Sequence, residues 1–232
     1  MNSDSKKEID DFLSGRATVK PIKKESENSE KFEKFHEPKI RIHTLVRKTI
    51  NVYRRAFSEL NMLQTLEPNM QSGHSYHCIS GGDVDSLTYL KHIIKQQTLD
   101  YCLFSTWCMA DDDILQFEEW LKNGNIKRLD AYCGEIFPGS YKKQWIALKD
   151  IVGAYGGRVC IFRNHSKIYA GTGEKFNFAI ESSANINTNP RTENTCITIG
   201  DDVYHFYKDF FDGIKSFNRD FDTWEKWEGT TK

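Results

Sequence analysis

From residue 74 onward, the apolar positions of the chain follow two different periods. Short runs rich in β-branched and aromatic residues, which are typical of strands, alternate with segments whose apolar residues recur at helical spacing. The predicted strands span residues 76–80, 101–107, 127–133, 158–170, 176–183 and 195–199, and the predicted helices span residues 85–94, 111–121, 140–154 and 203–217. This order predicts an α/β fold with a mostly parallel or mixed β-sheet flanked by helices.

The chain before residue 74 has a different pattern. Residues 1–38 are rich in Lys, Glu, Ser and Asp and contain few large apolar side chains, which predicts a flexible charged tail. Residues 40–63 place apolar side chains at helical spacing, which predicts an amphipathic helix within an N-terminal helical extension, residues 39–73. We therefore expect a tail, an extension and a main domain, residues 74–232.

The predicted N-terminal helix carries a basic stripe. Between residues 39 and 58 there are six basic and no acidic side chains, and four of the basic ones share a stripe: Arg47, Lys48, Arg54 and Arg55. One interpretation is the solvated face of a helix that packs on the core. The other is contact with the phosphates of a nucleic acid, and the sequence leaves both open.

Composition and charge narrow the class of protein. A chain of 232 residues with 13% aromatic residues can form one good hydrophobic core. The net charge of −1 leaves a polyanionic partner possible, because charge distribution matters more than the sum. No apolar run approaches the ~20 residues of a transmembrane helix, and the N-terminus lacks the apolar segment of a secretory signal. We expect a cytoplasmic protein without a membrane partner.

Six cysteines lie scattered through apolar stretches, at positions 78, 102, 108, 133, 160 and 196. Buried reduced thiols are the expected state. A zinc site could be assembled from His74, His77, Cys78, Cys102 and Cys108, but no CxxC pair supports it. No metal site is expected.

Polar side chains suited to phosphate chemistry gather toward the C-terminal end of the main domain. His165 and Lys167 are two residues apart, so on a strand they share a face and lie about 6.6 Å apart. Ser183 and Asn185 repeat this spacing one strand later, and Glu193 follows. A nucleophile, a fixed cation and two hydrogen-bonding groups around one point suit a phosphodiester.

The segment HSKIYAGTGEKFNFAIESSANIN, followed by RTENTCIT, resembles the HKD motif region of the phospholipase D superfamily, above all its short single-motif nucleases. His165 and Lys167 match the HxK pair, and the Ser-x-Asn and downstream acid of the motif are also present. Thr172 stands where the family has Asp, and Ser182 stands where it has Gly. With LFSTWCMADDDILQFEEWLKNGNIKRLDAYC and FDTWEKW, the resemblance extends over residues 74–227.

The resemblance implies a mechanism. His165 would attack phosphorus to form a phosphohistidine, while Lys167 and Asn185 hold the nonbridging oxygens. Ser183 would hydrogen-bond within the cluster, and Glu193, from a symmetric copy or a nearby strand, would orient the imidazole. Because no other histidine has a lysine two residues on, a C2 homodimer would supply the second histidine. This mechanism requires no metal and no other cofactor.

We therefore expect a nuclease or related phosphodiesterase acting on DNA or RNA. Trp107 or Tyr169 could stack on a base, although aromatic residues at such strand positions more often belong to the core. Two alternatives remain open. One is a catalytically weak or inactive scaffold that binds nucleic acid or protein, to which the departures at Thr172 and Ser182 point. The other is a phospholipase.

Overall fold

The computed structural model describes residues 44–66, 68–187, 191–218 and 224–229. The tail predicted for residues 1–38 lies outside these residues. The helices and strands, in chain order, are β1 (Ile50–Ser58), α2 (Glu59–Thr65), β2 (His74–Asp83), α3 (Leu87–Ile94), β3 (Leu99–Thr106), α4 (Asp111–Lys122), β4 (Leu129–Gly134), α5 (Phe137–Ser140), α6 (Lys142–Gly153), β5 (Val159–Phe162), β6 (Ile168–Gly173), β7 (Asn177–Ser182), β8 (Glu193–Ile199) and α7 (Asp201–Asp212).

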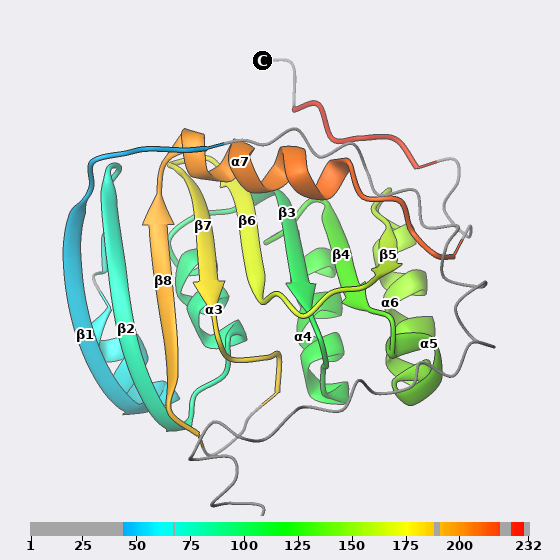
Figure 1. Cartoon of the computed structure of the whole chain (residues 1–232), viewed down its shortest axis with the longest axis horizontal. Helices are drawn as coiled ribbons and strands as arrows, with labels where there is room; N and C mark the ends of the chain where they lie inside the picture. The colour runs from blue at the N-terminus through cyan, green and yellow to red at the C-terminus, as the bar shows by residue number, and fades with distance from the viewer. Residues whose placement is uncertain (1–43, 67, 188–190, 219–223, 230–232) are drawn as a thin grey trace, which may run out of the picture. The chain divides into compact units, whose positions relative to one another are not determined.

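The described strands form one eight-stranded sheet in the order β1-β2-β8-β7-β6-β3-β4-β5 (Figure 1). At one edge β1 and β2 are parallel, and at the other β3, β4 and β5 are parallel. Every pairing between these two edges is antiparallel. The α/β class predicted from the sequence is confirmed, and the sheet is mixed rather than mostly parallel.

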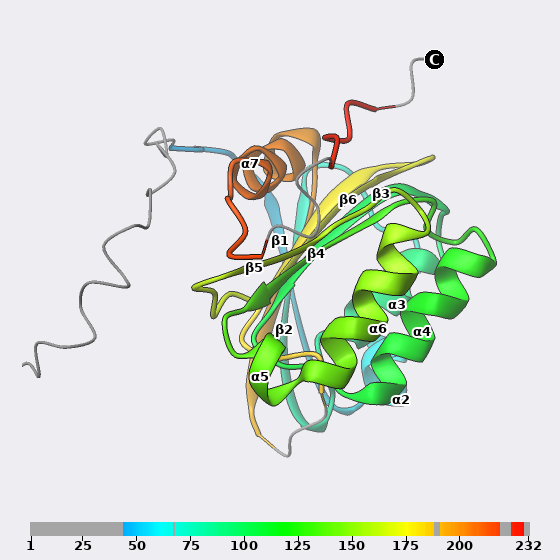
Figure 2. The same cartoon turned by 90° about the vertical axis from the view of Figure 1, so that its right-hand side faces the viewer.

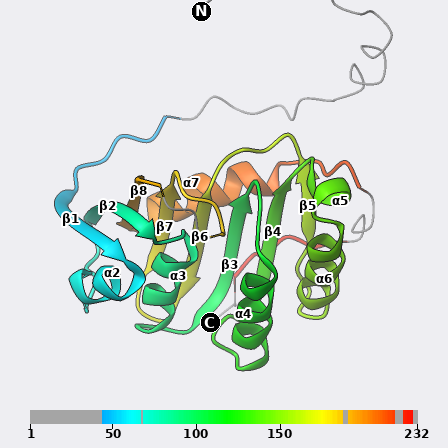
Figure 3. The same ribbon diagram turned by 90° about the horizontal axis from the view of Figure 1, so that it is seen from below.

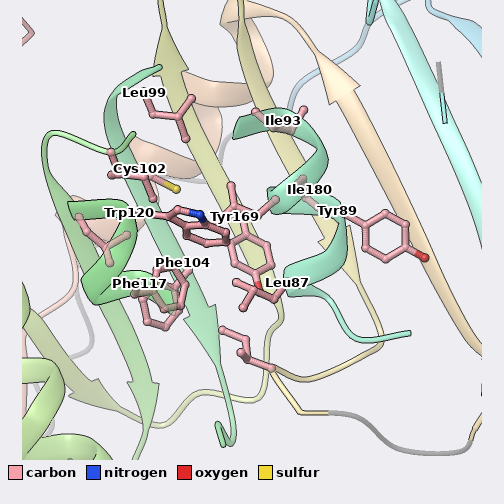
Figure 4. Packing of buried hydrophobic residues seen from close by; sticks show 14 of the residues in the cluster. Leu87, Tyr89, Ile93, Leu99, Cys102, Phe104, Phe117, Trp120, Tyr169 and Ile180 are labelled. Atoms are coloured by element: carbon pink, nitrogen blue, oxygen red, sulfur yellow. The ribbon is translucent and has the colours of Figure 1, made fainter. Parts of the chain in front are cut away.

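Helices cover both sides of the sheet. Helices α2, α3, α4 and α6 lie on one side, and α7 lies on the other (Figures 2 and 3). Under the first layer Phe104, Phe117 and Tyr169 are fully buried, and the rings of Phe104 and Phe117 stack with centroids 4.7 Å apart (Figure 4). Under α7, Phe211 packs on Tyr132, with ring centroids also 4.7 Å apart. The central strands are thus packed on both faces, which fixes the positions of their ends.

The helix predicted for residues 40–63 is wrong over residues 44–58, while residues 59–63 belong to helix α2 and residues 39–43 lie outside the described part of the chain. Residues 50–58 form strand β1, which pairs in parallel with β2 along the sheet edge, and only the short helix α2 follows. Val52 and Ala56 face the interior while Tyr53 and Arg55 face solvent, which is the two-residue period of a strand. The β-branched and aromatic residues of INVYRRAFS favour that outcome once β2 offers a partner.

The single strand predicted for residues 158–170 is also wrong. It consists of β5 at the sheet edge and β6 in the middle, which are separated in the sheet by β3 and β4. Residues 163–167 form the connection, which crosses the ends of β4 and β3 (Figure 1). His165 and Lys167 therefore lie just before β6 and not within a strand.

All six cysteines are free thiols; five are buried and Cys196 is half-buried, as expected from their apolar surroundings. No group of three or more His, Cys, Asp or Glu in the described residues could hold a metal ion. None of the described helices is long and apolar enough to cross a membrane.

Candidate active site

A cavity of about 320 Å³ opens where several strand ends meet. These strand ends lie at the lower edge of the sheet in Figure 1. The chain reaches it at the end of β3, just before β6, after β7 and at the start of β8. All five catalytic residues predicted from the sequence line it: His165, Lys167, Ser183, Asn185 and Glu193. The prediction that these side chains meet around one point is therefore consistent with the structure, although strand ends, rather than strand faces, bring them together.

His165 and Lys167 contact each other directly. Lys167 Nζ donates to the carbonyl oxygen of His165 at 2.6 Å and lies 3.0 Å from its Nδ1. The Lys167 side chain is almost fully buried while His165 is exposed to the cavity. Burial lowers the pKa of Lys167 from its ordinary value of 10.5, and the neighbouring Cys108 and Glu193 oppose this shift. The pair thus places a cation and an imidazole at the same wall of the cavity.

The connection that carries His165 is held by Asn164, which is buried. Its Nδ2 donates to the carbonyl oxygen of Tyr132 at 3.0 Å and to that of Thr106 at 3.3 Å. Its Oδ1 accepts from the backbone N–H of Ser166 at 2.9 Å and from the Ser166 hydroxyl at 2.6 Å. Asn164 therefore joins the ends of β3 and β4 to the residues on both sides of His165. Sequence reasoning missed this residue, because its partners are distant along the chain.

Ser183 and Glu193 also line the cavity and contact each other. The Ser183 hydroxyl donates to Glu193 Oε2, and the backbone N–H of Asn194 donates to Ser183 Oγ at 3.0 Å. These bonds tie the end of β7 to the start of β8. Among the described contacts Glu193 does not reach His165 of the same chain, so the predicted carboxylate–imidazole pair across a homodimer stays a prediction.

Asn185 is held by its backbone. Its carbonyl oxygen accepts from the N–H of Ser86 at 3.3 Å, at the start of α3, and the carbonyl oxygen of Ile186 accepts from the N–H of Ala110 at 3.2 Å, before α4. The side-chain Oδ1 of Asn185 is buried and has no hydrogen-bond partner among the described residues. Because buried polar atoms normally have partners, this carboxamide is a candidate for contact with a ligand, directly or with its amide reversed.

Two further lining residues had no role or only a secondary one in the sequence analysis. The Trp107 ring lies against the imidazole of His165 with centroids 5.2 Å apart. It fits there because Gly134 lacks a side chain: an added Cβ would lie 2.7 Å from the indole. Arg191 is exposed and also lines the cavity. Tyr169, the other expected stacking residue, is fully buried with its hydroxyl 2.9 Å from that of Ser86, so its predicted role in base stacking is wrong.

The four basic residues expected on one helical stripe have different surroundings. Arg47 pairs with Asp202 at 3.2 Å, and Arg54 donates to the carbonyl oxygens of Thr65 and Tyr53. Lys48 and Arg55 are exposed and have no ion pair in the described part of the chain. A common basic helical face does not exist, and nucleic-acid contact by these residues stays a prediction.

The two departures from the family motif remove no group from the cavity lining. Thr172 pairs with Asn177 at the far end of β6, several residues from Lys167. The Ser182 hydroxyl bonds to that of Thr195 at 2.7 Å and accepts from the N–H of Ala184 at 3.1 Å. Ser182 therefore stabilises the turn that leads into the site.

No family model matches the sequence, and no curated protein matches it. Polyphosphate kinase from Porphyromonas gingivalis is similar in structure, with 12% identity, a TM-score of 0.46, and coverage of 62% of this chain and 27% of that one. Phosphatidylserine synthase from Haemophilus influenzae Rd KW20 is similar with 9% identity, a TM-score of 0.43, and coverage of 60% of this chain and 37% of that one. The protein thus spans less than two fifths of either neighbour, and the function proposed for it rests on the geometry of its own site.

Proposed function

We propose that the protein is a metal-independent phosphodiesterase of the phospholipase D type that cleaves DNA or RNA. The observation that carries the proposal is the single cavity lined by His165, Lys167, Ser183, Asn185 and Glu193. Its volume of about 320 Å³ falls within the roughly 300–1,000 Å³ of ordinary ligand pockets. The resemblance of the HSKIYAGTGEKFNFAIESSANIN segment to the HKD motif supports the same chemistry.

The reaction has two steps. A ring nitrogen of His165 attacks phosphorus, a P–N bond forms and the P–O bond to the leaving strand breaks, with a proton delivered to the leaving oxygen. Water then attacks phosphorus, the P–N bond breaks, and the group that gave the proton takes one from the water. Lys167 and Asn185 stabilise the negative charge on the nonbridging oxygens of both transition states.

A second copy of the chain supplies the proton donor. The cavity contains one histidine, and its lining offers no second imidazole among the described residues. A C2 dimer that joins two cavities places the His165 of one copy as nucleophile and that of the other as acid. The family resemblance implies that Glu193 of one copy orients the imidazole of the other in such a dimer.

Two lining residues favour a nucleic acid as substrate. Arg191 is an exposed cation beside the cavity, suited to a neighbouring phosphate, and Trp107 presents an aromatic ring next to His165. The cavity is more polar than a lipid site, since a carboxylate, two amides and two cations share it.

The test is cleavage of labelled single- and double-stranded DNA and RNA, with excess chelator, by the wild type and by His165→Ala. We expect cleavage by the wild type and none by the variant, which should remain folded and dimeric by circular dichroism and sedimentation. Equal cleavage by the variant, or loss of activity in chelator that magnesium restores, contradicts the proposal. Headgroup release from vesicles without strand cleavage identifies a phospholipase, and binding without turnover of any substrate identifies a scaffold.

A further inference from the structure

A second hollow, of about 490 Å³, lies on the face of β1, β2 and β8. Its lining includes Tyr53, Arg55, His77, Ile79, Asn194 and Cys196. Helix α7 packs on β7 and β6, and no other described helix covers this part of the same face (Figure 1). The described residues thus leave an open portion of the sheet next to the candidate active site.

Two rings form a platform in this hollow. Tyr53 and His77 occupy paired positions on β1 and β2, and their rings stack with centroids 4.9 Å apart and planes 16° apart. Tyr53 is 71% exposed, so the outer face of the pair is open to solvent. The two rings cover each other's inner faces, so the outer face of Tyr53 is the surface on which an unpaired nucleobase can continue the stack, whereas the bases of a duplex already stack on one another.

The charge around this Tyr53–His77 platform suits a phosphate backbone. Arg55, on the same face of β1, is exposed and has no ion pair among the described residues. None of the described side chains lining the hollow is a carboxylate. Two acids lie close along the strands: Glu181 pairs with Cys196 and accepts a hydrogen bond from Tyr207, and Glu193 precedes Asn194 and accepts one from Ser183.

Strand β8 joins the platform to the catalytic cavity. Glu193 lines the cavity, and the next residue, Asn194, lines the hollow. Ser183 N–H donates to the carbonyl oxygen of Asn194 at 2.9 Å, and Asn194 N–H donates to Ser183 Oγ at 3.0 Å. The cavity and the hollow therefore share strand β8, on which Glu193 lies three residues from Cys196, the position paired with His77 of the platform.

We propose that the Tyr53–His77 platform, with Arg55, binds an unpaired segment of the nucleic-acid strand beside the cleaved phosphodiester. This inference rests on the proposed function and specifies its substrate as single-stranded nucleic acid. A base stacks on the outer face of the Tyr53 ring, which His77 supports from behind, and Arg55 contacts a phosphate of the same segment.

The test measures fluorescence anisotropy of a labelled oligothymidylate with His165→Ala, which binds without cleaving. In the His165→Ala background, we expect the combined substitutions Tyr53→Ala and His77→Ala to weaken oligothymidylate binding by about tenfold or more. Tyr53→Phe in the same background should keep the affinity, because stacking needs only the ring. Arg55→Gln should weaken binding and lower the slope of log K against log salt by about one. The same sequence as a duplex should bind more weakly than the single strand.

A small ester separates this inference from the proposed function. Hydrolysis of bis(p-nitrophenyl) phosphate by Tyr53→Ala with intact His165 should equal that of the wild type, because the ester cannot reach the platform. Absence of His165-dependent hydrolysis refutes the proposed function, whereas unchanged oligonucleotide affinity in the double variant refutes the platform. Preference for the duplex also refutes it, as does dissociation of the dimer in the double variant, which would make this face an interface between two copies.

Discussion

The ammonium of Lys167 donates toward Nδ1 of His165, with Nζ and Nδ1 3.0 Å apart. An ammonium has no lone pair, so this contact is a hydrogen bond only where Nδ1 accepts from Lys167. In the proposed reaction Lys167 holds a nonbridging oxygen of the phosphate, so the contact places the proposed cation directly beside the proposed nucleophile.

The first prediction concerns the pH dependence of activity. Loss of the Lys167 proton removes the cation, so kcat/KM should fall as pH rises through its pKa. Because burial lowers that pKa, the fall should begin below the ordinary lysine value of 10.5. Lys167→Arg should be slower, with no alkaline fall in this range, because a guanidinium keeps its charge. Hydrolysis of bis(p-nitrophenyl) phosphate across pH measures this. If kcat/KM of Lys167→Arg fell in the same way at alkaline pH, the fall would come from the titration of a group other than Lys167.

The α/β architecture could be predicted from the local pattern of apolar residues. The helix wrongly predicted over residues 50–58 shows what that pattern cannot decide. In residues 50–60 the apolar positions satisfy a helical period at Ile50, Tyr53 and Leu60. Nothing within the segment decides between helix and strand. The decision depends on β2, whose free edge pairs with residues 50–58 in parallel, a contact that no local period encodes.

The candidate site was predictable in its reactive groups but not in their support. His165, Lys167 and Ser183 were found because their spacing and residue types fit one reaction. Asn164 and Gly134 act through contacts with chain segments many residues away, and their residue types alone carry no catalytic signal. The supporting residues therefore needed the three-dimensional structure.

A second prediction tests Asn164 as a positioning residue. Asn164→Ala leaves the carbonyl oxygens of Tyr132 and Thr106 without their donor and should lower the free energy of unfolding by about 1–3 kcal/mol. It should also lower kcat, because His165 is no longer held, while oligonucleotide affinity changes little. Urea unfolding and single-turnover cleavage measure the two effects.

Gln97 offers a matched control for this variant. It is also a buried amide, which donates to the carbonyl oxygen of Phe176 at 2.9 Å and accepts from the N–H groups of Lys175 and Phe176, by the β6–β7 turn. Gln97→Ala should cost similar stability and leave kcat near that of the wild type. Equal losses of kcat in both variants would mean that lower stability alone explains the effect of Asn164→Ala.

A third prediction concerns the position of Trp107. In Gly134→Ala the new Cβ would lie 2.7 Å from the Trp107 ring and 3.0 Å from the carbonyl oxygen of Asn164, so the indole must move. We expect a change in tryptophan fluorescence, absent in a Trp107→Phe background, and lower kcat. Gly139→Ala is the control, because an added Cβ there meets no atom within 4 Å. Wild-type kcat in Gly134→Ala would show that the indole position is irrelevant to the reaction.

The last prediction concerns Asp113, in the first turn of α4. The N–H of Ala110 donates both to the Asp113 carboxylate at 3.1 Å and to the carbonyl oxygen of Ile186 at 3.2 Å, one residue beyond Asn185 of the candidate active site. Burial and the nearby Asp85 raise the pKa of Asp113 from 3.8 to about 6. The folded protein thus binds this proton more tightly than the unfolded chain, so the contribution to stability is present below pH 3.8 and is lost as pH rises to about 6.

Asp113→Asn keeps an acceptor for the Ala110 N–H and removes the titration. The variant should be more stable than the wild type at pH 7.5 by about 1–2 kcal/mol, less than the full shift implies because the group is partly hydrated. This advantage should shrink as pH falls toward 4, since the wild-type carboxyl is then protonated. Asp112→Asn, on the exposed side of the same turn, controls for the loss of one charge near the helix N-terminus. Urea unfolding at several pH values measures the difference in stability. A stability gain in Asp113→Asn that does not change with pH would show that burial does not raise the pKa of the Asp113 carboxyl.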